Sequence, residues 1–245
     1  MPVYRPETGY YKMMKLSKIA LITSCAFSFV LVSCQTDRIK ALAALKENNI
    51  EQLQKVFADA KAKGNVIHDT SQSSLLYEAC ESGSPQLVRM VWENINTRVS
   101  KECASSALHL RSKPILELLF EYDPEVTREC ANSWLTFINT ADFASFLMEH
   151  GCDPMIGLCN AQEADVFKVY LHAAGGVDKI PPRSMSLICD RIVSGDHVEM
   201  LTCLLEAGLD PDAPLCENGK SVREEIRYSP IPSGMYCRRL MFKKK

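Results

Sequence analysis

Residues 198–211, Val-Glu-Met-Leu-Thr-Cys-Leu-Leu-Glu-Ala-Gly-Leu-Asp-Pro, have the pattern of one helix followed by its stop. The apolar side chains that fall on one face at helical spacing are Val198, Met200, Leu201, Leu204 and Leu205. Gly208 stands where a left-handed residue would end the helix, and Pro211 prevents its continuation. The stretch therefore predicts an amphipathic helix with a tight exit turn.

Weaker copies of this pattern follow one another along most of the chain. The plainest internal echo is between residues 101–106, Lys-Glu-Cys-Ala-Ser-Ser, and residues 128–133, Arg-Glu-Cys-Ala-Asn-Ser. Each is followed by a second apolar run and then by an Asp-Pro dipeptide. Such repetition is typical of helix pairs that bury their apolar faces only against their neighbours. The sequence therefore predicts an all-α fold of about six stacked helix pairs with a C-terminal capping helix.

Two stretches carry a resemblance to ankyrin repeats. Residues 198–211 resemble the second helix and exit turn of that family, roughly E-I-V-K-L-L-L-E-x-G-A-D, and residues 74–83 resemble its first helix, T-P-L-H-x-A-A-x-x-G. The resemblance covers residues 38–226 and implies an ankyrin-like helical-repeat solenoid, although no copy has an intact T-P-L-H. Another α-solenoid or an irregular helical bundle is the alternative.

The N-terminus has the pattern of an export signal. Basic residues precede an apolar run over residues 19–32, which is too short to span a bilayer as a helix. The run ends in Leu-Val-Ser-Cys at residues 31–34, which resembles the lipobox of bacterial lipoproteins. An uncleaved membrane anchor and an ordinary signal peptide cut nearby are the alternatives.

The lipobox implies how this end is processed. Residues 1–33 are expected to be a signal peptide, with Met13 or Met14 as a possible true start, because the first residues are not typical of such a signal. Cys34 would then carry the lipid, and residues 34–37 would be a short tether. This implies a lipid-anchored protein of the bacterial cell envelope. The absence of Asp at position 35 favours the outer membrane, facing the periplasm.

The charge balance limits the partners. The whole chain has 28 Lys or Arg and 30 Asp or Glu, and removal of residues 1–33 leaves 24 and 29, a net charge of −5. A mildly acidic chain argues against nucleic acid or an anionic membrane surface as its main partner, because both attract basic patches. Residues 227–245 are expected to form a C-terminal cap and a solvated basic tail.

Nine cysteines remain beyond Cys25 and Cys34. An oxidising compartment would favour disulfides among them. Equivalent positions of neighbouring repeats are too far apart, because packed helices are about 8 to 10 Å apart and a disulfide needs Cα atoms within about 7 Å. Cys152 and Cys159, in an exit turn and the next first helix, are the better candidate pair. Most of the cysteines are expected to be small buried hydrophobic side chains.

Motifs that carry chemistry do not occur in the sequence. There is no C-x-x-C pair, no H-E-x-x-H, no G-x-S-x-G elbow and no glycine-rich phosphate loop. We therefore predict no catalytic residue, no metal site and no cofactor.

The ankyrin resemblance also indicates where a partner would bind. In that family partners contact the face formed by first helices and hairpin tips, and the matching polar positions are Glu78, Glu81, His109, Arg111 and Arg191. The hypothesis is a lipid-anchored envelope protein that binds another protein, of unknown identity, without catalysis. The alternative is a periplasmic enzyme or small-ligand-binding protein on an irregular helical scaffold.

Overall fold

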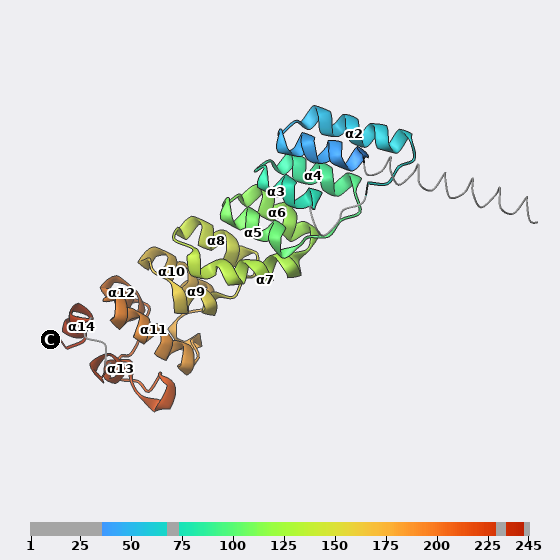
Figure 1. The fold of residues 1–245 in the computed structure, drawn as a ribbon. Coiled ribbons are helices and arrows are strands. Elements are labelled where there is room, and N and C mark those ends of the chain that lie inside the picture. Colours follow the sequence, from blue (N-terminus) through green and yellow to red (C-terminus); the bar gives the residue numbers. More distant parts are fainter. Residues whose placement is uncertain (1–35, 68–73, 229–233, 243–245) are drawn as a thin grey trace, which may run out of the picture. The chain divides into compact units, whose positions relative to one another are not determined.

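The computed structural model describes residues 36–67, 74–228 and 234–242 (Figure 1). These residues form helices joined by turns, and no β-strand occurs among them, so the all-α prediction is confirmed. The predicted signal peptide, its alternative starts and Cys34 lie outside the described residues. Within the described ranges no helix has the length and apolar character needed to cross a membrane. The chain divides after Arg98 into two compact units.

The N-terminal unit contains two helix pairs. Its helices are a first one over residues 36–46, α2 (Ile50–Ala62), α3 (Leu75–Glu81) and α4 (Pro85–Asn94). α4 packs against both α2 and α3. The buried carboxylate of Asp37 accepts a hydrogen bond from Asn65 Nδ2 at 2.8 Å and lies 3.5 Å from Lys63 Nζ. These contacts tie the first helix to the turn that follows α2.

The C-terminal unit contains ten α-helices within the described residues. The first six are α5 (Lys101–His109), α6 (Lys113–Tyr122), α7 (Pro124–Trp134), α8 (Ala141–Glu149), α9 (Pro154–Asn160) and α10 (Ala164–Ala173). The others are α11 (Pro182–Gly195), α12 (Val198–Glu206), α13 (Val222–Tyr228) and α14 (Met235–Phe242). Short 3-10 turns are η1 (Leu135–Phe137), η2 (Val177–Lys179) and η3 (Glu217–Gly219).

These ten helices alternate between two layers (Figure 1). In one layer α5 packs on α7, α9 packs on η1 and α11, and α11 packs on α13. In the other, α8, α10, α12 and α14 pack in that order, and ring contacts between Phe120 and Phe146 join α6 to α8. In this unit each helix pair, from α5 with α6 to α13 with α14, thus places its first helix in one layer and its second in the other.

The Asp-Pro dipeptides begin helices. Asp123 Oδ1 accepts a hydrogen bond from the N–H of Val126 at 3.2 Å, and Asp153 Oδ1 accepts one from the N–H of Met155 at 2.9 Å. The proline that follows each aspartate takes the first helical position, where a missing N–H leaves nothing unsatisfied. Each of these two dipeptides is therefore the start of the next first helix.

The exit turn predicted at Gly208 is present. Gly208 has φ +92°, its N–H donates to Leu205 O at 3.1 Å, and the N–H of Leu209 donates to Leu204 O at 3.0 Å. This pair of bonds is the Schellman motif. It recurs at Gly151 with φ +76° and at Gly175 with φ +85°. The same local chemistry therefore ends α8, α10 and α12.

The apolar face of α12 is buried in the stack. Met200, Leu201, Cys203 and Leu204 are buried, whereas Val198 and Leu205 are half-buried. Burial of a leucine side chain contributes about 1.5 to 3 kcal/mol relative to exposure. The helix is thus held mainly by its neighbours in both layers.

Candidate partner-binding surface

An aromatic cluster lies where α5 and α7 end. The ring of His109, the last residue of α5, meets that of Trp134, the last of α7, edge to face at 6.1 Å between centroids. Trp134 in turn meets Phe137 of η1 at 5.8 Å. Phe137 is 68% exposed and Leu110, next to His109, is 46% exposed. We call these four residues the aromatic patch.

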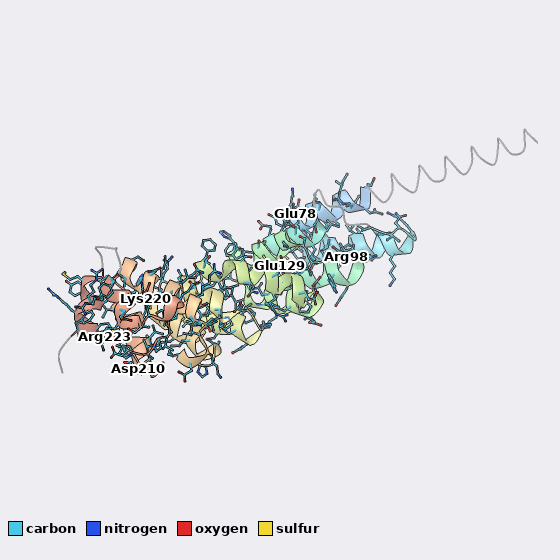
Figure 2. The ribbon with its side chains drawn as sticks, turned by 90° about the horizontal axis from the view of Figure 1, so that it is seen from below. Glu78, Arg98, Glu129, Asp210, Lys220 and Arg223 are labelled. Carbon is cyan, nitrogen blue, oxygen red and sulfur yellow. The ribbon has the colours of Figure 1, made fainter. Side chains whose placement is uncertain are left out.

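The patch is open to solvent because of the way in which the turn after α7 directs its side chains. α5 and α7 pack side by side with Lys101 Nζ 2.6 Å from Glu129 Oε1, and Figure 2 labels Glu129 on this part of the stack. Leu135 turns inward and is buried, whereas Phe137 points out of the 3-10 turn. Neighbouring apolar side chains that are exposed together are typical of interaction sites.

Arg111 borders the patch in a left-handed turn. Its φ is +51°, its N–H donates to Leu108 O at 3.0 Å, and the N–H of Ser112 donates to Ala107 O at 3.1 Å. The turn is the Schellman motif again, here with arginine in the place that glycine usually takes. The exposed side chain of Arg111 therefore lies directly after the patch along the chain.

Within the C-terminal unit, only two residues of the predicted binding face are neighbours. His109 and Arg111 lie together at the end of α5. Arg191 on α11 is half-buried, and its Nε atom is buried with no hydrogen-bond partner among the described residues. Glu78, half-buried, and Glu81, exposed, lie on α3 of the N-terminal unit.

Sequence reasoning missed the apolar members of the patch. Trp134 and Phe137 flank a buried leucine, and a short apolar run of this kind is ambiguous between core and surface. The sequence feature that could have indicated the patch is the position of Trp134 at the end of a first helix. His109 also lies at the end of a first helix, in the same layer.

The nine described cysteines are free thiols, and Cys152 and Cys159 form no disulfide in this structure. The thiol of Cys159 instead points to Ser184 O on α11, at 3.9 Å. Burial raises the pKa of Cys152 to about 12, against a smaller opposite effect of Arg128. A thiol with so high a pKa is inert at neutral pH.

A different pair of thiols is in contact. Cys189 on α11 and Cys216 before η3 are both buried and are hydrogen-bonded to each other. The N–H of Glu217 donates to Ser186 Oγ at 2.9 Å, which fixes this turn on α11. The hydrogen bond lowers the pKa of the Cys216 thiol and raises the pKa of Cys189, because ionisation of the first opposes ionisation of the second.

An open groove runs between α10 and α12. It holds about 600 Å³ and is lined in part by His172, Cys203 and Glu206. Burial raises the pKa of the Cys203 thiol. The groove thus has the size of a small-molecule site but lacks an activated nucleophile among these residues. In the described residues no group of three or more His, Cys, Asp and Glu could hold a metal ion.

Comparison with protein-family models, with curated proteins and with solved structures gave no match to this chain.

Proposed function

We propose that the chain is a lipid-anchored envelope protein that binds another protein without catalysis, through the aromatic patch and Arg111. The observation that supports this most is the exposure of Phe137 and Leu110 beside Trp134. Aromatic residues and arginine are enriched among the residues that dominate protein–protein binding energy. Rings that are already packed on one another lose little conformational entropy when a partner covers them.

We further propose that the helix pairs are degenerate ankyrin repeats. Two layers of short helices and the recurring left-handed exit turns support this relationship. The patch lies in the layer of first helices, which is where partners of ankyrin repeats bind. The absence of strands among the described residues means that hairpin tips do not contribute to this surface there.

The membrane attachment is proposed from the lipobox alone. Cys34→Ala should abolish metabolic labelling with a lipid precursor and release the protein from the membrane fraction. Persistence of both the label and the membrane association would contradict the assignment of Cys34.

Partner binding is tested by capture. The chain from residue 35 to 245, which contains all the described helices, is immobilised and incubated with solubilised envelope. Retained proteins are identified by mass spectrometry, purified and bound again. One protein that binds again in pure form is the expected result, and its reproducible absence would contradict the proposal.

A small-ligand-binding protein is the second candidate, because of the groove between α10 and α12. Its lining by His172, Cys203 and Glu206 offers polar contacts. Ligand sites usually enclose most of their ligand, however, whereas this one is an open groove. A ligand that raises the melting temperature of wild type but not of Glu206→Ala would favour this candidate over the first.

A further inference from the structure

The outward face of the last helix is apolar and aromatic. On α14, Cys237 and Met241 are buried against the stack, whereas Met235, Tyr236 and Phe242 are exposed on the other side, Tyr236 to 57%. The terminal helix of a repeat array usually has a polar outer face, because no further repeat covers it. This face of α14 therefore differs from an ordinary solvated cap.

Arginine side chains lie over these rings. The guanidinium of Arg227 on α13 is 5.6 Å from the ring centroids of both Tyr228 and Phe242. The guanidinium of Arg239 is 5.7 Å from the ring of Tyr236. Tyr228 is 67% exposed, so it extends the same kind of surface onto α13. The cap face consists of Arg227, Tyr228, Met235, Tyr236, Arg239 and Phe242.

The cap face belongs to a strongly basic segment. Residues 218–245 contain eight Lys or Arg and two Glu, a net charge of +6, whereas residues 1–217 contain 20 and 28, a net charge of −8. Figure 2 labels Lys220 and Arg223 in this segment. Lys220 is paired with Glu225 and Arg223 with Asp212. Arg227 and Arg239 lie over the exposed rings, and the guanidinium of Arg223 also lies 5.7 Å from the ring of Phe242. The weak acidity of the whole chain conceals this local charge.

The cap face is held in a fixed position on α11. The carboxylate of Asp196 accepts hydrogen bonds from the N–H of Cys237 at 3.0 Å and of Tyr236 at 3.2 Å. Gly234 lies so close to α11 that an added Cβ would be 2.9 Å from Val193 O. The exposed rings are therefore presented by a docked helix rather than by a loose end.

This combination of residues fits one kind of occupant best. Tyrosine, phenylalanine and arginine together are typical of surfaces that lie in the headgroup layer, where rings reach the acyl boundary and cations meet lipid phosphates. The same face of a second copy would bring basic residues against basic residues. We propose that the cap face binds a bilayer surface rich in anionic phospholipid. This proposal does not depend on Cys34 or on the aromatic patch.

Vesicle sedimentation tests the proposal. The chain from residue 35 to 245, which lacks the lipid, is mixed with vesicles of phosphatidylcholine alone or with an equal part of phosphatidylglycerol. We expect binding only to the anionic vesicles, weakened by added salt. Because each basic residue near an anionic surface contributes about fivefold, Arg227→Gln with Arg239→Gln should weaken binding roughly 25-fold.

Two further variants distinguish binding through the cap face from an effect of the net charge of the protein. Tyr236→Ser with Phe242→Ser keeps the charge and should also weaken binding at least about tenfold, because it removes the inserted rings. Lys179→Gln with Arg183→Gln removes the same charge from exposed positions at the end of η2 and the start of α11 and should change binding by less than about twofold. Circular dichroism confirms that all variants are folded.

Three results would overturn the proposal. One is equal binding to neutral and anionic vesicles, and another is equal loss in the control variant and the cap-face variants. The third is failure to bind vesicles while the same cap-face residues bind an acidic protein, which would assign the face to a protein partner.

Discussion

Arg111 occupies a backbone conformation that costs an L-residue about 1 to 2 kcal/mol. Its φ of +51° closes the exit turn of α5 as glycine closes the turn of α12. Arg111→Gly relieves that strain and adds chain entropy to the unfolded state, so we expect the free energy of unfolding in urea to stay equal or to rise by up to about 1 kcal/mol.

Gly208→Ala is the matched control for Arg111→Gly. No atom lies within 4 Å of the added Cβ, so the folded state changes only in backbone strain. This strain outweighs the lower chain entropy of the unfolded state, and the free energy of unfolding should fall by about 1 kcal/mol. A loss of stability in Arg111→Gly as large as in this control would show that the arginine side chain itself holds the turn.

Gly157 is a case in which packing opposes helix propensity. It lies inside α9, and an added Cβ would be 2.6 Å from the ring of Tyr170, which is fully buried. Alanine gains up to about 1 kcal/mol of intrinsic helix preference, whereas overpacking of a closed core costs about 1 to 3 kcal/mol. We expect Gly157→Ala to lower the melting temperature. An unchanged or higher value would mean that the Tyr170 ring can move aside.

At the scale of elements, α14 is attached through the carboxylate of Asp196, the residue that caps the C-terminus of α11. Burial raises the pKa of Asp196, but the hydrogen bonds from the N–H groups of Cys237 and Tyr236 outweigh it, so the net pKa lies below its ordinary value. A depressed pKa stabilises the folded form above the unfolded pKa of about 3.9, and that stabilisation is lost as the pH falls through the folded value.

The predicted pH effect is local. Amide exchange of Tyr236 and Cys237, corrected for the intrinsic rate, should lose protection as the pH falls from 5.5 to 2 through the lowered pKa of Asp196. Asp196→Asn should show weak protection at both pH values, because a neutral amide accepts these bonds less strongly. Equal pH dependence in wild type and Asp196→Asn would contradict the role of this carboxylate.

Helical elements were predictable from sequence wherever the apolar period was intact. The face of α12 and the turn at Gly208 follow from spacing alone, and the structure confirms both. The Asp-Pro spacing indicates where repeats end, and Asp123 does follow α6 directly. What the spacing does not show is that Asp123 and Asp153 also cap the following helix. A short connection lets Asp123 end one helix and begin the next.

Contacts between distant residues could not be predicted in this way. The helical spacing of apolar residues does not show that Cys189 contacts Cys216. It also does not show that Phe137 points outward while Leu135 points inward. These details depend on how successive pairs rotate on one another, and a single sequence contains no direct record of that rotation.

On the scale of the whole molecule, stability should be shared among neighbouring pairs. Leu204 is fully buried in α12, between α10 and α14 in their layer and beside α11 in the other. Because each pair buries its apolar face only against its neighbours, Leu204→Glu should unfold several C-terminal helices together and lower the helical circular dichroism signal.

Ala207→Glu is the control for this effect. It adds the same carboxylate at an exposed position at the end of α12 and should leave the helical signal unchanged. A normal helical signal and melting curve in Leu204→Glu would contradict the stacked arrangement of the C-terminal unit.

The central functional claim is that the aromatic patch binds a protein. Its most direct test is capture from solubilised envelope by three immobilised chains side by side: wild type, Phe137→Ser and Leu187→Ser, the last removing a similarly exposed apolar side chain from α11. We predict that wild type and Leu187→Ser retain the same protein, and that Phe137→Ser retains at least about tenfold less of it. Equal retention by all three chains would contradict the claim.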